Sequence, residues 1–350
     1  MKQKIISRIQ AGWVGFFNFI LALFLLTSCG QIQYLITQGI GQLKIQTKAK
    51  DNQTILDNPV IKKEYKEKIL QITKYKDFFY NYFKKRPTSI YSKTTLLETK
   101  AVSYLLIVSL STKIEPLLFN FPIVGHFPYI GFFNFTDAIN EKKKYDLQNY
   151  HTYLRPVYAY STLGFMDDPI LSSFFYFDEI ELANLIFHEL FHTIFFIKDE
   201  VGLNENMANY FANQLTLEYF KGKINQEKML ENEKKLEALI KKVVDLSKEL
   251  NDIYSKAINN EHGTLLQKFL SDSFYPQIKS FCHDKQIGID YCFPLVGEWN
   301  NARFSEFSTY EELQDILSLH HKKLGGSLYD FYLYLQQEEN LNHVKTLFSH

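Results

Sequence analysis

Two histidines and a glutamate near the middle of the 350-residue chain have the spacing of a metal site, in the pentapeptide His188-Glu189-Leu190-Phe191-His192. Residues four apart lie one above the other on an α-helix, so both imidazoles can point at one metal ion, usually zinc. Glu189 lies about 100° further round a helix of ~3.6 residues per turn. From there it can take a proton from the water that the metal activates. The pattern therefore predicts a metal-dependent hydrolase.

The residues around this pentapeptide favour a metal site over its simplest alternative, a core helix with two hydrogen-bonded histidines. Most positions from 186 to 196 are apolar, and buried histidine and glutamate side chains are costly without partners. Gly202 then marks a break, and Asn204 is a candidate N-cap for a second helix. We expect Glu205 to return to the first helix as the third ligand. Such a set leaves a fourth position for water, as in catalytic zinc sites.

The sequence resembles a family of bacterial predicted aminopeptidases, zincin-like HExxH metallopeptidases that are often lipoproteins. Four stretches carry the resemblance in matching order: Tyr160-Ser161-Thr162-Leu163-Gly164 with Asp167-Asp168-Pro169, Glu181-Leu182-Ala183, Asn204-Glu205 with Ala208, and Asn300-Asn301-Ala302-Arg303 with Thr309-Tyr310. The resemblance implies a peptide or protein substrate, one zinc ion, and a helix-rich α+β fold, zincin-like, with a small sheet packed on the HExxH helix. Aminopeptidase activity rests on this resemblance alone. An endopeptidase or envelope amidase with the same zinc chemistry, and a catalytically inactive lipid-anchored scaffold, remain the alternatives.

Further residues are candidates for binding the substrate. We expect a strand at 157–163, and we expect residues 160–164 to bind an extended substrate by backbone pairing. Tyr160 is a candidate donor of a hydroxyl to the oxyanion, whereas for Tyr158 we favour simple packing. The carboxylate of Asp168 either binds a substrate amine or caps the next helix.

Four more polar residues are candidates for supporting the metal centre. Asn301 and Arg303 carry part of the resemblance, and Arg303 could orient the Glu205 carboxylate or stabilise the oxyanion; the alternative is a buried ion pair. Asn204 and Glu200 could support the ligands from behind, with Glu200 holding the other nitrogen of a histidine.

The N-terminus has the pattern of an exported lipoprotein. Three basic residues among the first eight precede an apolar stretch from Ala11 to Leu26, and Thr27-Ser28-Cys29 follow. A charged segment, an apolar segment and small residues before the cut indicate a secretory signal peptide at 1–28, and the ending resembles a bacterial lipobox with Cys29 as the lipidated residue. A single membrane-spanning helix is the alternative, because the run is near the ~17-residue lower limit. We therefore expect a protein anchored to a membrane through Cys29 in the bacterial cell envelope, on the outer membrane or periplasmic face in a Gram-negative organism.

Composition limits the remaining possibilities. The 39 basic and 39 acidic residues balance, which gives no reason to expect a nucleic-acid partner. With 46% hydrophobic residues, the chain can form one zinc metallopeptidase domain at 29–350, with a helical arm at about 221–281. Cys282 and Cys292 form either a local disulfide or two free thiols, since the expected compartment permits disulfides.

Apolar periodicity and turn residues predict the other elements. We expect helices at 31–46, 57–85 and 137–145, and strand-rich segments at 91–110 and 119–135. His126 in the last of these could approach the metal cleft, although a loop histidine with its own hydrogen bonds is the simpler interpretation.

Overall fold

The computed structural model describes residues 29–121, 125–159, 162, 167–223, 226–257, 262–308 and 312–347. The chain divides into two compact units, Met1–Lys48 and Ala49–His350. The described part of the first unit is helix α2 (Cys29–Lys48), which agrees with the helix predicted at 31–46. The predicted signal peptide lies outside the described residues. Within the described part of the chain, no helix combines the length and the apolarity needed to cross a bilayer.

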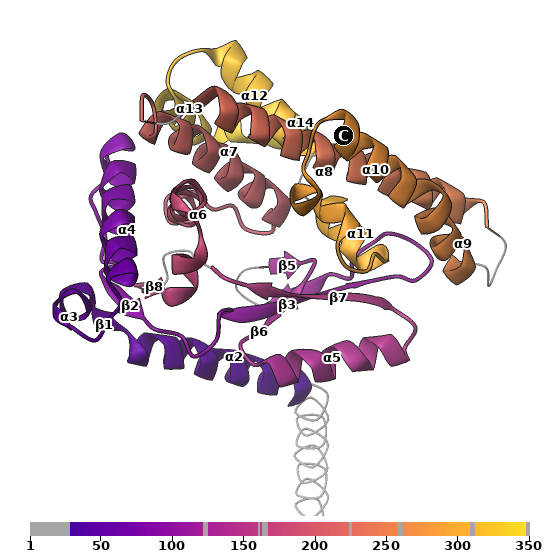
Figure 1. Ribbon diagram of the computed structural model, residues 1–350, viewed down its shortest axis with the longest axis horizontal. Coiled ribbons are helices and arrows are strands. Elements are labelled where there is room, and N and C mark those ends of the chain that lie inside the picture. Colours follow the sequence, from indigo (N-terminus) through magenta and orange to yellow (C-terminus); the bar gives the residue numbers. More distant parts are fainter. Residues whose placement is uncertain are drawn as a thin grey trace, which may run out of the picture. The chain divides into compact units, whose positions relative to one another are not determined.

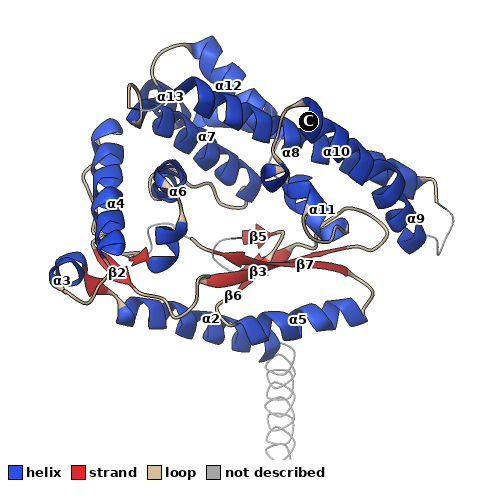
Figure 2. Cartoon of the chain, viewed as in Figure 1, coloured by secondary structure: helices blue, strands red, loops and turns tan. Residues whose placement is uncertain are grey.

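The second unit contains more helix than strand (Figure 2). Its described strands are β1 (Lys50–Asp51), β2 (Lys93–Thr95), β3 (Ser103–Ser109), β4 (Phe119–Phe121), β5 (Gly125–Phe127), β6 (Ile130–Phe132), β7 (His151–Val157) and β8 (Ile170–Leu171). They form three small sheets with the orders β1–β2–β8, β6–β3–β7 and β4–β5, as far as the described residues extend. The pairing of β2 with β8 is parallel and the other pairings are antiparallel. This composition agrees with the predicted α+β, helix-rich class.

The helices of this unit are α3 (Asn52–Asp57), α4 (Lys63–Tyr82), α5 (Phe135–Leu147), α6 (Glu179–His192), α7 (Val201–Tyr219), α8 (Gln226–Ser255), α9 (His262–Phe269), α10 (Tyr275–Asp284), α11 (Asn301–Ser308), α12 (Glu312–Leu324), α13 (Leu328–Leu335) and α14 (Glu338–Leu347). Helix α5 covers one face of the β6–β3–β7 sheet and α11 the other (Figure 1). The sheet is therefore enclosed between two helices.

Helix α6 carries the HExxH pentapeptide and is buried between other helices. It begins with a capping box, in which the Asp178 side chain accepts from the backbone of Glu181 while the Glu181 side chain accepts from the backbone of Asp178. Its strongest contacts are with α4 and α7, which lie on either side of it in Figure 1. Phe191 of α6 stacks on Phe211 of α7 with ring centroids 4.3 Å apart. The main packing partners of α6 are thus helices, and the small sheet expected to pack on this helix stays a prediction.

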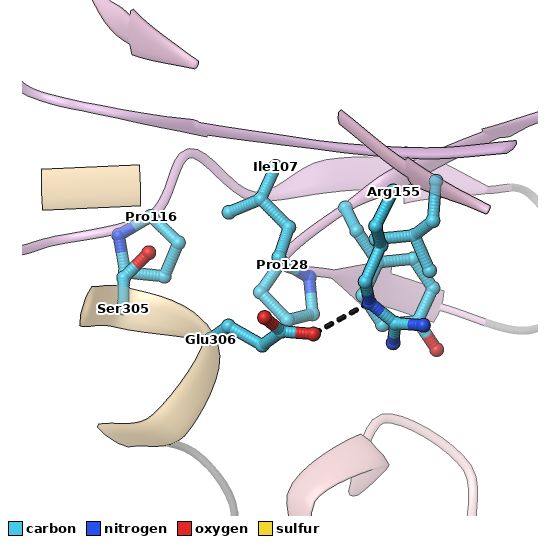
Figure 3. A pocket seen from close by; sticks show the side chains of 8 residues that line it. Ile107, Pro116, Pro128, Arg155, Ser305 and Glu306 are labelled. Atoms are coloured by element: carbon cyan, nitrogen blue, oxygen red, sulfur yellow. Dashed lines mark ion pairs between the residues drawn. The ribbon is translucent and has the colours of Figure 1, made fainter. Parts of the chain in front are cut away.

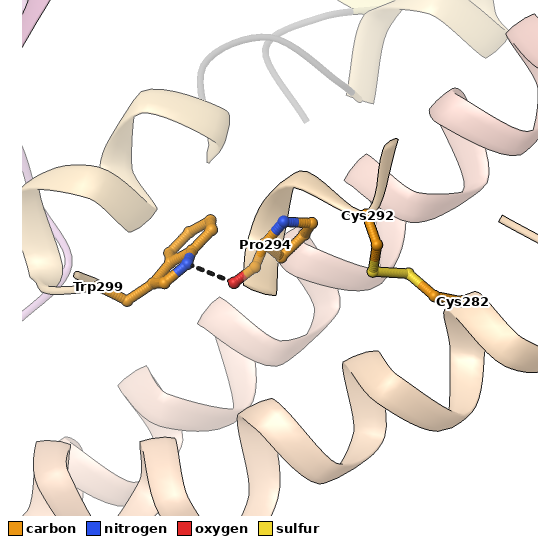
Figure 4. Close-up of a disulfide and its surroundings, with 4 residues drawn as sticks. All are labelled: Cys282, Cys292, Pro294 and Trp299. Atoms are coloured by element: carbon orange, nitrogen blue, oxygen red, sulfur yellow. Dashed lines mark hydrogen bonds between the residues drawn. A yellow bond between two sulfur atoms is a disulfide. The ribbon is translucent and has the colours of Figure 1, made fainter. Parts of the chain in front are cut away.

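The predicted helical arm is present as a hairpin. Helix α8 packs against α9 and α10, and the five-residue π-helical segment Leu270–Phe274 joins these two helices into one rod. A cluster of buried apolar side chains that includes Leu246, Leu250 and Phe274 fills the hairpin. Cys282 at the end of α10 forms a disulfide with Cys292 (Figure 4), so the pairing predicted as one of two alternatives is the one present.

Two predicted boundaries need correction. The helix expected at 57–85 begins only at Lys63, because Pro59 separates it from α3. The strand expected at 157–163 does not extend over its described residues: β7 ends at Val157, where its partner β3 begins with the pair Ser103–Val157. Of the residues after Val157, the described positions 158, 159 and 162 belong to no strand. The proposed substrate segment 160–164 lies, except for Thr162, outside the described residues.

Candidate metal centre and active site

Helices α6 and α7 bring two imidazoles and one carboxylate together. The Nε2 atoms of His188 and His192 are 3.1 Å apart. From α7, Glu205 places one carboxylate oxygen 3.4 Å from His188 Nε2 and the other 3.6 Å from His192 Nε2. All three side chains offer ligand atoms within 4.8 Å of one another. The predicted ligand set therefore forms one cluster that could hold a metal ion.

The spacing of these atoms fits zinc. Ligand atoms ~2.0–2.1 Å from a tetrahedral zinc ion lie about 3.3–3.4 Å from one another. The three distances within the cluster, 3.1, 3.4 and 3.6 Å, lie close to that value. Two imidazole nitrogens and one carboxylate are also the protein ligands of several catalytic zinc sites. His188, His192 and Glu205 are thus suited to zinc in both geometry and chemistry.

Without a metal, the three side chains of the cluster shift one another's pKa values in different directions. Burial disfavours ionisation of Glu205, but the hydrogen bond from His188 and the positive charges of His192, His188 and Arg155 outweigh it and lower the pKa of Glu205 to about 2. Burial also disfavours protonation of His188, yet the hydrogen bond and charge of Glu205 raise its pKa. For His192, burial dominates and lowers the pKa to about 4. An ionised Glu205 therefore faces one imidazole that readily holds a proton and one that does not.

Glu189, the predicted general base, lies in a buried acidic environment. Its residue is 6% exposed, and burial raises the pKa of its carboxyl to about 7. This value includes the charge of His188, which lowers the pKa, and the charges of Glu205 and Asp168, which raise it. Tyr91 also faces this group: burial, followed by the charges of Glu189 and Asp168, raises the pKa of Tyr91 well above its usual value. The Tyr91 hydroxyl is buried and has no hydrogen-bond partner among the described residues.

Asp168 is a buried carboxylate near Glu189 that forms hydrogen bonds with the neighbouring backbone. Its carboxylate accepts hydrogen bonds from the backbone N–H of Thr162 at 2.8 Å and from the Thr162 hydroxyl at 3.0 Å, and the residue is 4% exposed. Its backbone carbonyl accepts from the backbone N–H of Tyr91 at 2.7 Å. Asp178 caps the next helix instead. Asp168 is thus a buried neighbour of Glu189, and the binding of a substrate amine by its carboxylate stays a prediction.

Asn301 and Arg303 have structural partners at the start of α11. The Asn301 amide donates to the carbonyl of Leu110 at 2.8 Å and accepts from the hydroxyl of Tyr254 at 3.0 Å. The Arg303 guanidinium donates to two backbone carbonyls in the loop before α11 and lies 4.3 Å from the ring of Trp299. These contacts correct the expected roles in the site. The arginine whose charge acts on Glu205 is Arg155 of β7.

The contacts of Asn204 and Glu200 also differ from those predicted. Helix α7 begins at Val201, so Asn204 lies inside it and caps nothing. The Asn204 amide instead accepts from the backbone N–H of Ile197 and donates to its carbonyl, which ties the α6–α7 loop to α7. The Glu200 side chain pairs with Lys345 at 3.6 Å rather than with a histidine.

Asn209, which the sequence analysis did not single out, is the residue whose side chain acts on His188 and contributes to the raised pKa of that imidazole. It lies four residues after Glu205 on α7, on the same face of the helix. That spacing is the signal by which it could have been found in the sequence.

Of the two tyrosines considered as oxyanion donors, Tyr160 lies outside the described residues. Tyr158 packs edge-to-face against Phe177 with ring centroids 6.2 Å apart, which agrees with the packing role predicted for it.

A pocket of about 240 Å³ opens beside Glu205. It is lined by Pro116, Leu118, His126, Pro128, Tyr129, Asp199, Val201, Gly202 and Glu205; we call it the Asp199 pocket. His126 Nδ1 lies 3.6 Å from a carboxylate oxygen of Asp199. His126 lies in β5 rather than in a loop, and it lines the same pocket as Glu205.

A second, smaller pocket shares Pro116, Pro128 and Tyr129 with the Asp199 pocket. Its side chains include Arg155, which pairs with Glu306 of α11 (Figure 3). Because Arg155 also acts on Glu205, the two pockets adjoin the candidate metal centre along one side of the sheet.

Comparison with known proteins gives one match. A family model described as "Putative aminopeptidase" matches residues 33–346. No curated protein and no solved structure matches the chain. The matched range includes all residues of the candidate metal centre, together with Glu189 and the Asp199 pocket.

Proposed function

The chain belongs to the putative aminopeptidase family, and we propose that it is a zinc-dependent peptidase that removes residues from the amino terminus of peptides. The observation that supports this most directly is the convergence of His188, His192 and Glu205 beside a buried Glu189. Three protein ligands leave a fourth position for water, which is the arrangement of catalytic rather than structural zinc. A HExxH helix followed by a glutamate ligand on the next helix also supports a zincin-like relationship.

In this proposal each residue has a distinct task. His188, His192 and Glu205 would hold zinc, which, when bound, polarises the scissile carbonyl and acidifies the attacking water. Glu189 accepts the proton of that water on its carboxylate and delivers it to the nitrogen of the leaving amine. Burial raises the pKa of Glu189 to about 7, so this carboxylate is a stronger base than one in water and suits proton transfer near neutral pH.

Asn209 and Asp168 position the groups that carry out the chemistry. The side chain of Asn209 acts on His188 from the same helix as Glu205, and in this proposal it orients that imidazole toward the metal. Asp168 places a second negative charge near Glu189 and holds the adjoining loop through Thr162. Removing either side chain should therefore weaken the site without removing a ligand or the base.

The test uses the full-length protein in detergent, loaded with zinc. Hydrolysis of peptides with free and with acetylated amino termini is measured with and without a chelator, alongside Glu189→Gln. The proposal expects chelator-sensitive, stepwise removal of residues from free-amine peptides, and a loss of about 10²- to 10⁴-fold in kcat for Glu189→Gln. Internal cleavage of acetylated peptides would instead identify an endopeptidase. No metal binding and no cleavage would leave the inactive scaffold.

We also propose that Cys29 carries a lipid that anchors the protein in the cell envelope. The basic residues, apolar segment and small residues before Cys29 support this. Cells fed an alkyne-tagged fatty acid should label the parent protein but not Cys29→Ala. Equal labelling of both proteins would refute the assignment.

A further inference from the structure

The Asp199 pocket is placed to receive the first residue of a peptide. In an aminopeptidase, one residue separates the free amine from the scissile carbonyl, so the group that binds the amine must lie close to the metal ligands. The pocket meets this requirement because Glu205, a proposed ligand, forms part of its wall. Its volume of about 240 Å³ is slightly below the ~300–1,000 Å³ of sites for drug-sized molecules. One amino-acid residue is an occupant of suitable size.

The pocket combines apolar walls with one carboxylate that does not belong to the metal cluster. Pro116, Leu118, Pro128, Tyr129 and Val201 supply most of the walls. The side chain of Asp199 is 50% exposed, and its ion-pair partner is an imidazole, that of His126. An imidazole is charged only when protonated, unlike lysine or arginine. A cation that enters the pocket can therefore pair with Asp199 without displacing a permanent positive charge.

The backbone around Asp199 fixes the position of this carboxylate. Asp199 itself has φ +62°, in the left-handed region, and Gly125 of β5 has φ +97°. A Cβ atom added to Gly125 would lie 1.8 Å from a carboxylate oxygen of Asp199. Glycine is therefore required at 125 for the carboxylate to lie against the hairpin. Strained residues of this kind persist where the surrounding structure holds them, and they are frequent at ligand-binding sites.

We propose that Asp199 binds the ammonium group at the amino terminus of the substrate, while the apolar walls of the Asp199 pocket contact its first side chain. This inference rests on the proposed function, and it explains how the site would distinguish a free amino terminus from an internal peptide bond. It also assigns the amine-binding role to Asp199 rather than to the buried Asp168. A lysine or arginine side chain offers a similar cation, so the test must separate the two sources.

The experiment measures binding rather than turnover. Full-length Glu189→Gln protein, loaded with zinc, is titrated by calorimetry with three peptides: Leu-Ala-Phe amide, its acetylated form, and acetyl-Lys-Ala-Phe amide. The free-amine peptide should bind about tenfold or more tightly than its acetylated form, since a hydrogen bond to a charged group is worth about that factor. Asp199→Asn in the same background should remove most of this preference.

A matched control is the neighbouring carboxylate. Glu200→Gln removes an equal charge one residue away, but Glu200 pairs with Lys345 and does not line the pocket, so the preference should persist. Circular dichroism and zinc content should be unchanged in both variants. An equal loss in Glu200→Gln, or a preference that survives Asp199→Asn, would overturn the assignment.

The remaining outcomes separate the two hypotheses. If Asp199→Asn weakens only the acetyl-lysyl peptide, the pocket binds a basic side chain and the assignment to the terminal amine is overturned. Failure of the zinc-loaded parent to hydrolyse any peptide would count against the proposed function. The amine preference of the Glu189→Gln protein would still support the Asp199 site in that case, because it is measured without turnover.

Discussion

Replacement of Glu205 by glutamine gives the most direct test of the metal centre. Glutamine keeps the size of the side chain and one amide oxygen but loses the negative charge. Apparent zinc affinities of about 10–16 kcal/mol in four-ligand sites correspond to about 3 kcal/mol per ligand. Because the amide oxygen remains as a weak ligand, we expect a loss of about 2–3 kcal/mol, or roughly 30- to 150-fold in Kd.

The distances in the cluster explain why this loss should be specific. The two carboxylate oxygens of Glu205 lie 3.4 and 3.6 Å from His188 Nε2 and His192 Nε2, so the charge removed is the one that faces both imidazoles. Zinc affinity is measured by competition with a chromophoric chelator at pH 7.5, and circular dichroism verifies the fold. Glu200→Gln, which alters an outlying ion pair with Lys345, serves as the control and should bind zinc like the parent.

One result would refute this reasoning. If Glu205→Gln binds zinc as tightly as the parent while remaining folded, the third ligand is another residue and the cluster is only a hydrogen-bonded histidine pair. A loss of similar size in Glu200→Gln would indicate a general electrostatic effect rather than ligation.

Three further predictions follow from the same contacts. Zinc affinity should fall with pH, with Kd rising by up to about tenfold per pH unit for one displaced proton. The reason is that the pKa of His188 is raised and zinc binds only the neutral imidazole. Chelator competition at pH 6, 7 and 8 checks this, and a Kd independent of pH would contradict it. Asn209→Ala should weaken zinc binding about 10- to 100-fold, because Asn209 acts on His188 and the loss of a group that orients a metal ligand has an effect of this size. The same assay measures this change, and parental affinity would show that Asn209 does not position the ligand. Replacing both Cys282 and Cys292 with serine should lower the free energy of unfolding by about 3 kcal/mol, the value for a disulfide that closes a loop of this length. Urea unfolding of the reduced and the oxidised parent protein provides the comparison. Equal unfolding midpoints would refute this prediction.

The candidate metal ligands could be identified from the sequence because a helix repeats locally. His188 and His192 are four residues apart, and this spacing alone places them on one face of α6. Glu205 could be assigned because a break and a second apolar-periodic stretch follow the first helix closely. Asn209 obeys the same rule relative to Glu205 and was missed only because no chemistry was expected of an asparagine there.

Residues that reach the site through sheet pairing could not be predicted in this way. Arg155 acts on Glu205 from β7, and Arg303, which carried the resemblance, forms contacts with its own loop. Nothing in the local pattern around Arg155 indicates a partner 50 residues later in the chain. The strand predicted at 157–163 does not extend over its described residues for a related reason, because the end of β7 depends on where β3 begins.

The environment of the general base shows what the HExxH pattern leaves open. The pattern places Glu189 beside a metal ligand but does not state how strong a base it is. That property arises chiefly from burial, with further contributions from the charges of Glu205 and Asp168. Asp168 is brought to Tyr91 because the two residues precede the parallel strands β8 and β2. A parallel pairing joins segments that are distant in sequence, and here they are separated by about 75 residues. The candidate ligand set thus follows from helix periodicity, whereas one of the charges that act on Glu189, that of Asp168, is positioned by a two-residue strand pairing that no local pattern in the sequence indicates.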